Sequence, residues 1–165
     1  MKILYISSLI LKKGSSASIR NTGLIKGLND NKVIVDILTI KYPEQLEDDY
    51  LKNILIKNKI YFNNLKILDG YLKLKNKGTL QKNGFLKNIL AFLKKIIKNI
   101  YFFPDIDKEW IKEVSKLKIN FNEYDLIITS SDTKTSHYIG RNIKKNIQIY
   151  HGSKYGEIHG LVILE

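Results

Sequence analysis

The sequence predicts an α/β domain with a Rossmann-like, open and mainly parallel sheet flanked by helices. Three observations predict it. Residues 2–8 and 33–40 are apolar runs of the kind found in strands buried on both faces. Residues 18–29 have a helical pattern between these runs, which makes a strand–helix–strand unit with a right-handed crossover. A further apolar run at residues 125–131 predicts another parallel strand of the same sheet.

The first strand leads into a turn rich in Gly, Ser and Lys at residues 12–17, and the helix follows. The apolar residues of this helix are expected on one side. They are Ile19, Leu24, Ile25 and Leu28. The run Asn29-Asp30-Asn31 ends the helix before the second strand begins.

The middle of the chain is less regular. Residues 43–58 predict an irregular connection with a short helix, residues 59–69 a short strand, and the Lys-rich residues 70–84 a loop. Residues 85–103 carry the strongest helical pattern of the chain, because apolar residues recur there at spacings of three and four. Pro104 ends this helix.

The last third of the chain returns to the α/β pattern. Residues 106–117 predict a helix, and the strand at residues 125–131 follows it. The next helix is expected from a cap at residues 132–133 to about residue 145, and residues 147–150 predict a last short strand.

Length and composition set the limits of the function. The 165 residues predict one domain over residues 1–158 and a short tail, residues 159–165. The chain has no Cys, which excludes a disulfide scaffold and a thiolate nucleophile, and its three His residues lack the spacing of a metal site. We therefore expect no metal and a cytoplasmic protein.

The charge of the chain is strongly positive. Lys and Arg number 28 against 16 Asp and Glu, a formal net charge of +12. This favours an anionic partner, such as nucleic acid, an acidic lipid surface or a phosphate-bearing substrate. A genome rich in A and T would also enrich Lys, Asn and Ile together. Only Arg20 and Arg141 are Arg, which counts against base reading in DNA.

The turn after the first strand is the first candidate binding site. Gly14, Ser15 and Ser16 lead into a helix N-terminus whose free N–H groups suit a phosphate or a sugar, and Arg20 in that helix could clamp an anion. The turn has neither the three spaced glycines of a dinucleotide site nor the Gly-Lys-Ser of a phosphate-binding loop. The alternative is a plain helix cap beside a surface Arg.

The end of the strand at residues 125–131 is the second candidate. Ser130 and Ser131 would face the same cleft as the first turn, because the carboxyl ends of parallel strands share one edge of the sheet. Their hydroxyls could bind a ligand or simply cap the next helix. His137 lies inside that helix, with no acidic residue spaced to form a triad.

The segment from Gly70 to Pro104 has eight Lys and no Asp or Glu. An apolar helix flanked by lysines can lie on an anionic membrane surface. We expect such contacts from its lysines Lys87, Lys94, Lys95 and Lys98. The alternative is a core-packing helix with a solvated face.

With these features in place, the chain resembles the N-terminal domain of a family-4-like, GT-B-type glycosyltransferase of bacterial surface-polysaccharide synthesis. Several stretches in order carry the resemblance. They are Met1-Lys-Ile-Leu-Tyr-Ile-Ser7, Gly14 and Arg20 before a helix, the strand at 33–40, Phe103-Pro-Asp105, Trp110, Tyr124-Asp-Leu-Ile-Ile-Thr-Ser-Ser131, Ser136-His-Tyr-Ile-Gly140, Lys144-Lys145 and Ile147-Gln-Ile-Tyr150.

The resemblance implies one half of a GT-B fold that binds a saccharide or lipid-linked acceptor, with Gly14 and its neighbours near the phosphates of a nucleotide-sugar. Ser130 and Ser131 stand where many members carry a His, so no catalytic His is transferred. The donor-binding half has no counterpart here. We therefore expect no sugar transfer by this chain alone and no other cofactor. The chain would be a truncated gene product, a fragment, or one half of a split enzyme whose donor domain is a separate chain.

Two readings of function follow. The first is this acceptor-binding domain, acting in the synthesis of surface polysaccharide or glycolipid at the inner face of the membrane. The second is a non-enzymatic, basic α/β module that binds nucleic acid or an acidic partner, although no nucleic-acid-reading motif supports it.

Overall fold

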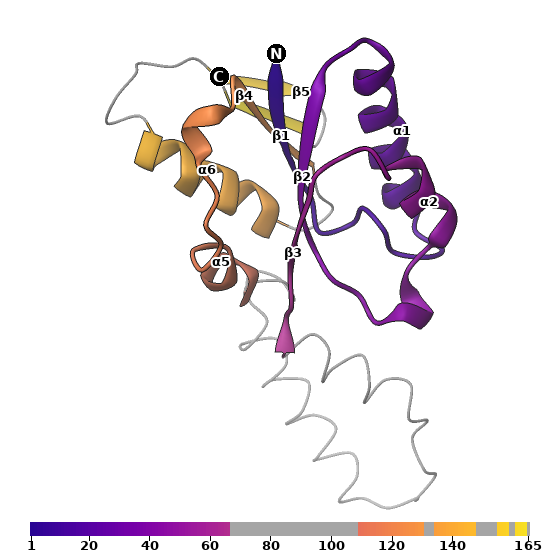
Figure 1. The fold of residues 1–165 in the computed structure, drawn as a ribbon. Coiled ribbons are helices and arrows are strands. Elements are labelled where there is room, and N and C mark those ends of the chain that lie inside the picture. Colours follow the sequence, from indigo (N-terminus) through magenta and orange to yellow (C-terminus); the bar gives the residue numbers. More distant parts are fainter. Residues whose placement is uncertain (67–108, 131–133, 148–154, 159–160, 165) are drawn as a thin grey trace, which may run out of the picture.

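The structure, a computed structural model, describes residues 1–66, 109–130, 134–147, 155–158 and 161–164 (Figure 1). For residues 145–147, 155–158 and 161–164 it describes the backbone alone. The predicted loop at residues 70–84 and the predicted basic helix at residues 85–103, with Lys87, Lys94, Lys95 and Lys98, lie outside these ranges.

The elements follow the α/β order that the sequence predicts. They are β1 (Lys2–Ile6), α1 (Ser16–Asp30), β2 (Ile34–Ile40), the 3₁₀ turn η1 (Glu44–Leu46), α2 (Asp49–Ile54), β3 (Ile60–Asn63), α5 (Glu109–Val114), the 3₁₀ turn η2 (Phe121–Glu123), β4 (Leu126–Ser130), α6 (Thr135–Ile147), β5 (Tyr155–Ile158) and β6 (Leu161–Leu164).

The described strands form one sheet in the order β3-β2-β1-β4-β6-β5. The first four of these strands are parallel to one another, whereas β6 is antiparallel to both β4 and β5. An open, mainly parallel sheet flanked by helices is therefore confirmed.

Two predictions near the end of the chain differ from the structure. Leu161–Leu164 form a strand within the sheet, whereas residues 159–165 were expected as a tail. The apolar run pairs with the free edge of β4, which would otherwise leave backbone groups unpaired. Ile147 ends helix α6 instead of opening a strand, and residues 148–150 lie outside the described ranges.

Helices cover both faces of the sheet (Figure 1). Side chains alternate along each strand, so each strand contributes to two cores. Tyr5 and Ile37 belong to the core beneath α1 and α2. Leu4 and Leu38 belong to the core beneath α5 and α6, together with the fully buried Trp110.

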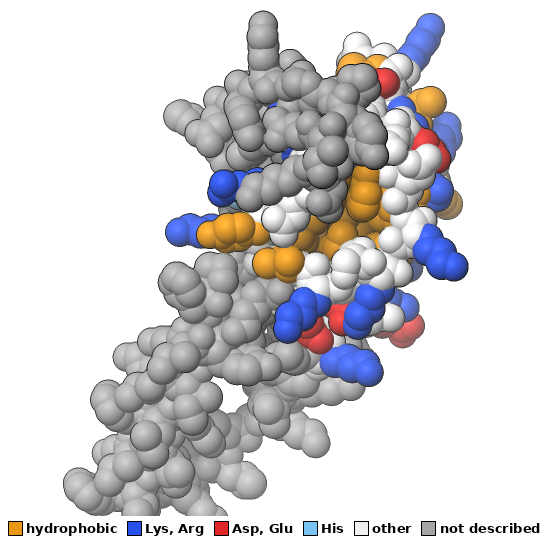
Figure 2. Space-filling view, turned by 90° about the vertical axis from the view of Figure 1, so that its left-hand side faces the viewer, with side chains coloured by type: hydrophobic (Ala, Val, Ile, Leu, Met, Phe, Trp, Pro, Cys, Tyr) orange, Lys and Arg blue, Asp and Glu red, His pale blue; other side chains and the backbone are white. Residues whose placement is uncertain are grey.

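The face of α5 and α6 carries a shallow apolar groove. Figure 2 shows hydrophobic side chains gathered in the middle of this face, with Lys and Arg at its border. The groove has a volume of about 350 Å³, and Ile111, Leu117, Phe121 and Ile143 are among the residues that line it. No helix within the described ranges is both long enough and apolar enough to cross a bilayer.

Helix α1 does not pack as its apolar pattern predicts. Ile19 is 63% exposed and Leu24 is 40% exposed, although both were expected on the buried side. The buried side of the first two turns instead carries Ser18, Asn21 and Thr22. This part of α1 lies over the end of β1, where it contacts polar groups rather than apolar side chains.

Candidate functional site

The sheet has a topological switch point between β1 and β4. These strands are neighbours and parallel. The helix after β1, α1, covers one face of the sheet, and the helix after β4, α6, covers the other (Figure 1). In open α/β sheets, ligands bind in the crevice at the carboxyl ends of two such strands.

The turn before α1 forms one side of this crevice. Gly14 has a φ of +68°, a backbone conformation that favours glycine, and a Cβ at that position would meet no atom within 4 Å. Glycine is therefore favoured at this position by the backbone conformation and not by crowding. Ser15 caps α1, since its hydroxyl accepts a hydrogen bond of 3.4 Å from the backbone N–H of Ser18. Ser16 and Arg20 are exposed.

Behind this turn, Asn21 holds together a buried network of neutral groups. Its Oδ1 accepts hydrogen bonds from the hydroxyls of Tyr5, at 3.0 Å, and Ser130, at 2.8 Å. Its Nδ2 donates to the Ser7 hydroxyl, at 3.0 Å, and to the Leu9 carbonyl, at 2.8 Å. A single amide thus connects β1, the loop after it, α1 and the end of β4.

The positive charge of Arg20 acts on this network. Burial raises the pKa of the Tyr5 phenol, while the hydroxyl of Ser130 and the positive charge of Arg20 act in the opposite direction. An anion in the crevice would meet the guanidinium of Arg20 together with the N-terminus of α1.

The other side of the crevice is formed by β4 and α6. The side chain of Thr129 lies 2.8 Å from Nδ1 of His137, which stands in the first turn of α6 and is half-buried. The hydroxyls of Ser18 and Ser136, in the first turns of α1 and α6, are buried and have no hydrogen-bond partner among the described residues.

The structure brings together some of the predicted site residues. Gly14 and Ser15 lie in the turn before α1, Ser16 and Arg20 lie at the start of α1, and the Ser130 hydroxyl bonds to α1 through Asn21. The Ser130 hydroxyl, predicted to face a ligand, donates to Asn21 instead. Ser131 lies outside the described ranges.

Sequence reasoning missed Tyr5, Asn21 and the Thr129–His137 pair. A signal for Asn21 exists in the chain. Ser18, Asn21 and Thr22 recur at spacings of three and four and continue the line of the buried Ile25, so they form a polar stripe at helical spacing.

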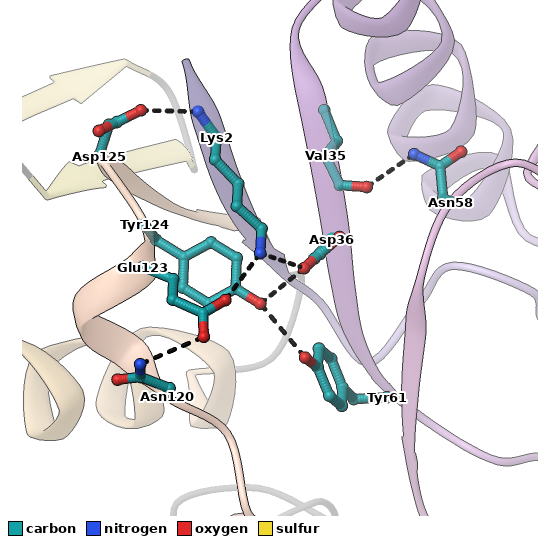
Figure 3. Close-up of polar contacts among 9 residues, drawn as sticks. All are labelled: Lys2, Val35, Asp36, Asn58, Tyr61, Asn120, Glu123, Tyr124 and Asp125. Carbon is teal, nitrogen blue, oxygen red and sulfur yellow. Dashed lines mark hydrogen bonds and ion pairs between the residues drawn. The ribbon is translucent and has the colours of Figure 1, made fainter.

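A second polar network lies at the opposite end of the same strands (Figure 3). Lys2 pairs with the carboxylates of Glu123, at 2.9 Å, and Asp36, at 3.4 Å. The Tyr124 hydroxyl donates to Asp36 over 2.7 Å, and the Tyr61 hydroxyl lies 3.4 Å from that of Tyr124. This network fastens β1, β2, β3 and the start of β4 to one another.

The charges of this second network shift several pKa values. The hydrogen bond between Lys2 and Glu123 raises the pKa of the amine and lowers that of the carboxyl group. The pKa of Tyr124 is raised, first by burial and then by its hydrogen bonds with Tyr61 and Asp36. The groups satisfy one another, which is the arrangement of a structural network.

Among the described residues, no group of three His, Cys, Asp or Glu could hold a metal ion. Comparison with protein-family models, with curated proteins and with solved structures finds no match to this chain. The case for a function therefore depends on the crevice between β1 and β4.

Proposed function

We propose that the chain is the acceptor-side, N-terminal domain of a GT-B-type, family-4-like glycosyltransferase that acts in the synthesis of surface polysaccharide or glycolipid. The observation that supports the proposal is the switch-point crevice between β1 and β4, with the Gly14 turn and Arg20 on one side and His137 on the other. In this proposal, sugar transfer takes place only together with a donor-binding domain.

The chemistry of the crevice suits a saccharide and a phosphate. Hydroxyls, an amide and an imidazole at the strand ends can exchange hydrogen bonds with the hydroxyl groups of a sugar. The free N–H groups of α1 and the exposed Arg20 suit the phosphates of a nucleotide-sugar or of a lipid-linked acceptor. Gly14 lets such a group approach the backbone closely.

Mapping of backbone amide shifts tests the proposal directly. The chain, labelled with ¹⁵N, would be titrated with UDP, with GDP and with a panel of neutral saccharides. We expect shift changes in residues 7–22 and 129–138, and none around Lys2 and Glu123 at the opposite end. Changes that gather at the opposite end, or none with any ligand, would refute the site.

A pair of arginine variants sharpens this test. Arg20→Ala should weaken nucleotide binding about tenfold or more, since a charge-assisted hydrogen bond contributes about 1.5–3 kcal/mol. Arg141→Ala is the matched control, because Arg141 is the only other Arg and is exposed on α6. Equal affinity losses in the two variants would show a general charge effect.

Activity measurements test whether sugar transfer requires a separate donor-binding domain. The chain alone should give no transfer from UDP- or GDP-sugars, and transfer should appear when a GT-B donor-binding domain is added. Robust turnover by the chain alone would contradict this part. Binding of duplex DNA with a steep salt dependence, without saccharide or nucleotide binding, would favour the basic binding module instead.

A further inference from the structure

We propose that the amino end of the sheet carries a second interaction surface, which docks on an anionic lipid bilayer. The surface is a groove of about 550 Å³ between the ends of α1 and α2 and the starts of β2 and β3. Its rim includes Lys32, Lys57 and Lys59, and its apolar residues include Ile34 and Ile56. We call these five residues the lysine groove.

The residues that line the groove carry more positive than negative charge. Of the two acidic residues that line it, Asp30 pairs with Lys26 at 2.7 Å, and Asp36 pairs with Lys2 and accepts the Tyr124 hydroxyl. Among the described residues, Lys32, Lys57 and Lys59 have no carboxylate partner; the ammonium of Lys59 instead lies 4.7 Å from the centre of the Tyr61 ring.

The apolar residues of the groove stand out from the surface. Ile34 is 60% exposed and Ile56 is 77% exposed, and Tyr50 on the adjoining α2 is 73% exposed. Protruding isoleucines beside lysines suit a lipid interface, where apolar side chains insert and ammonium groups meet anionic headgroups. Nucleic acid would use the lysines but leave the isoleucines in water.

The groove is held in shape by its own polar contacts. The side chains of Asn29 and Asn58 exchange two hydrogen bonds, of 2.9 and 3.2 Å, and Asn58 also donates to the Val35 carbonyl at 2.8 Å. Lys32 has a φ of +62° at the end of α1, where glycine is usual. Because this backbone conformation is unfavourable for lysine, we infer that the Lys32 side chain contributes to binding at the groove rim.

The proposal is independent of the glycosyltransferase proposal. The lysine groove lies at the opposite edge of the sheet from the β1–β4 crevice, so docking would leave the crevice open to the aqueous side. It also differs from the contact expected of Lys87, Lys94, Lys95 and Lys98, which belong to another part of the chain.

Flotation of the full chain with lipid vesicles tests the proposal. Vesicles would contain neutral lipid alone or about 30% anionic lipid. We expect binding to the anionic vesicles only. Each lysine near such a surface strengthens binding about fivefold, so the triple variant Lys32→Gly, Lys57→Gln, Lys59→Gln should bind about 100-fold more weakly. No binding by the wild-type chain would overturn the proposal.

A matched triple variant separates the groove from net charge. Lys41, Lys112 and Lys118 are exposed and lie outside the groove, so their change to Gln removes the same charge elsewhere. Its binding should fall much less. Equal losses in both triple variants would overturn the proposal, as would a loss confined to a variant of Lys87, Lys94, Lys95 and Lys98.

Variants of the two isoleucines test whether the partner is a lipid bilayer. Ile34→Ser with Ile56→Ser should weaken vesicle binding even at about 0.5 M salt, where charge attraction is screened. Both residues are exposed, and circular dichroism would verify that the variant is folded. Vesicle binding that is unchanged in this variant, or equally tight lysine-dependent binding to polyglutamate or DNA, would show a general polyanion surface and overturn the proposal.

Discussion

The two ends of the central strands carry polar networks of opposite kinds. At the carboxyl ends, Tyr5, Ser7, Asn21 and Ser130 are neutral and each is at most 4% exposed. At the amino ends, the network around Lys2 consists of ion pairs, and the Lys2 side chain is 28% exposed. The buried network at the carboxyl ends is neutral, whereas the network at the amino ends consists of charged groups.

The difference follows from the solvent around each network. Ion pairs that water reaches contribute little to stability and tolerate change, whereas a buried hydrogen bond is costly to break because it leaves groups without partners. The carboxyl end is therefore rigid behind its exposed turn. Such a support suits a binding crevice, since a ligand meets groups that are already in position.

Asn21→Ala should give the largest effect on this comparison. It removes the partner of Tyr5, Ser7 and Ser130 inside the protein. We expect the free energy of unfolding to fall by about 3 kcal/mol, measured by urea denaturation. A loss below about 1 kcal/mol would mean that the network is not the support described above.

Asp36→Asn should have a smaller effect at the other end. The amide oxygen can still accept the Tyr124 hydroxyl, and only the attraction to Lys2 is lost. We expect a loss of about 1 kcal/mol, which salt reduces. Lys26→Met, which breaks the exposed pair with Asp30, is the control, and salt should change its stability no more than that of the wild type. A larger loss for Asp36→Asn than for Asn21→Ala would reverse the comparison.

Alkaline titration compares the tyrosines of the two ends. The pKa values of Tyr5 and Tyr124 are both raised above the ordinary 10.0, so the stability from their neutral phenols is present below pH 10 and is lost as the pH rises above it. Tyr124→Phe should reduce this pH-dependent loss of stability more than Tyr5→Phe does, because hydrogen bonds with Tyr61 and Asp36 add to the effect of burial on the pKa of Tyr124. Unfolding curves from pH 8 to 11 measure it; equal slopes in both variants would contradict it.

Lys32→Gly should give the smallest effect, and in the opposite direction. Glycine accepts the φ of +62° without strain, but it also makes the unfolded chain more flexible. We expect a net stabilisation of about 0.5 kcal/mol in thermal or urea unfolding. A clear destabilisation would show that the Lys32 side chain has a structural role.

The sequence predicts most of the sheet because its signals are local. The strands at Lys2–Ile6, Ile34–Ile40 and Leu126–Ser130 are apolar on both faces, and the helices between them end at recognisable residues. Leu161–Leu164 is also apolar, yet its place beside β4 depends on an antiparallel pairing between distant segments. No local pattern encodes that pairing.

The sequence predicted the residues of the candidate site at the exposed turn, but it did not predict the buried network behind that turn. Gly14, Ser15 and Arg20 have local signals, which are turn chemistry and a helix start. The role of Asn21 depends on Tyr5 and Ser130, which come from other elements. If every helix is assumed to bury an apolar side, Asn21 is predicted to be exposed and Ile19 to be buried. The structure shows the opposite, since Asn21 is buried and Ile19 is 63% exposed.

The central place of β1 has a consequence for the synthesis of the protein. The β2 partner of β1 follows closely in the sequence, but its other neighbour, β4, comes directly after Asp125, whose carboxylate accepts a hydrogen bond from the backbone N–H of Lys2 across 123 residues of sequence. At a ribosomal rate of about 5–20 residues per second, the second edge of β1 waits about 6–25 s for its partner. During that time the edge of β1 that pairs with β4 in the folded protein has no strand to pair with.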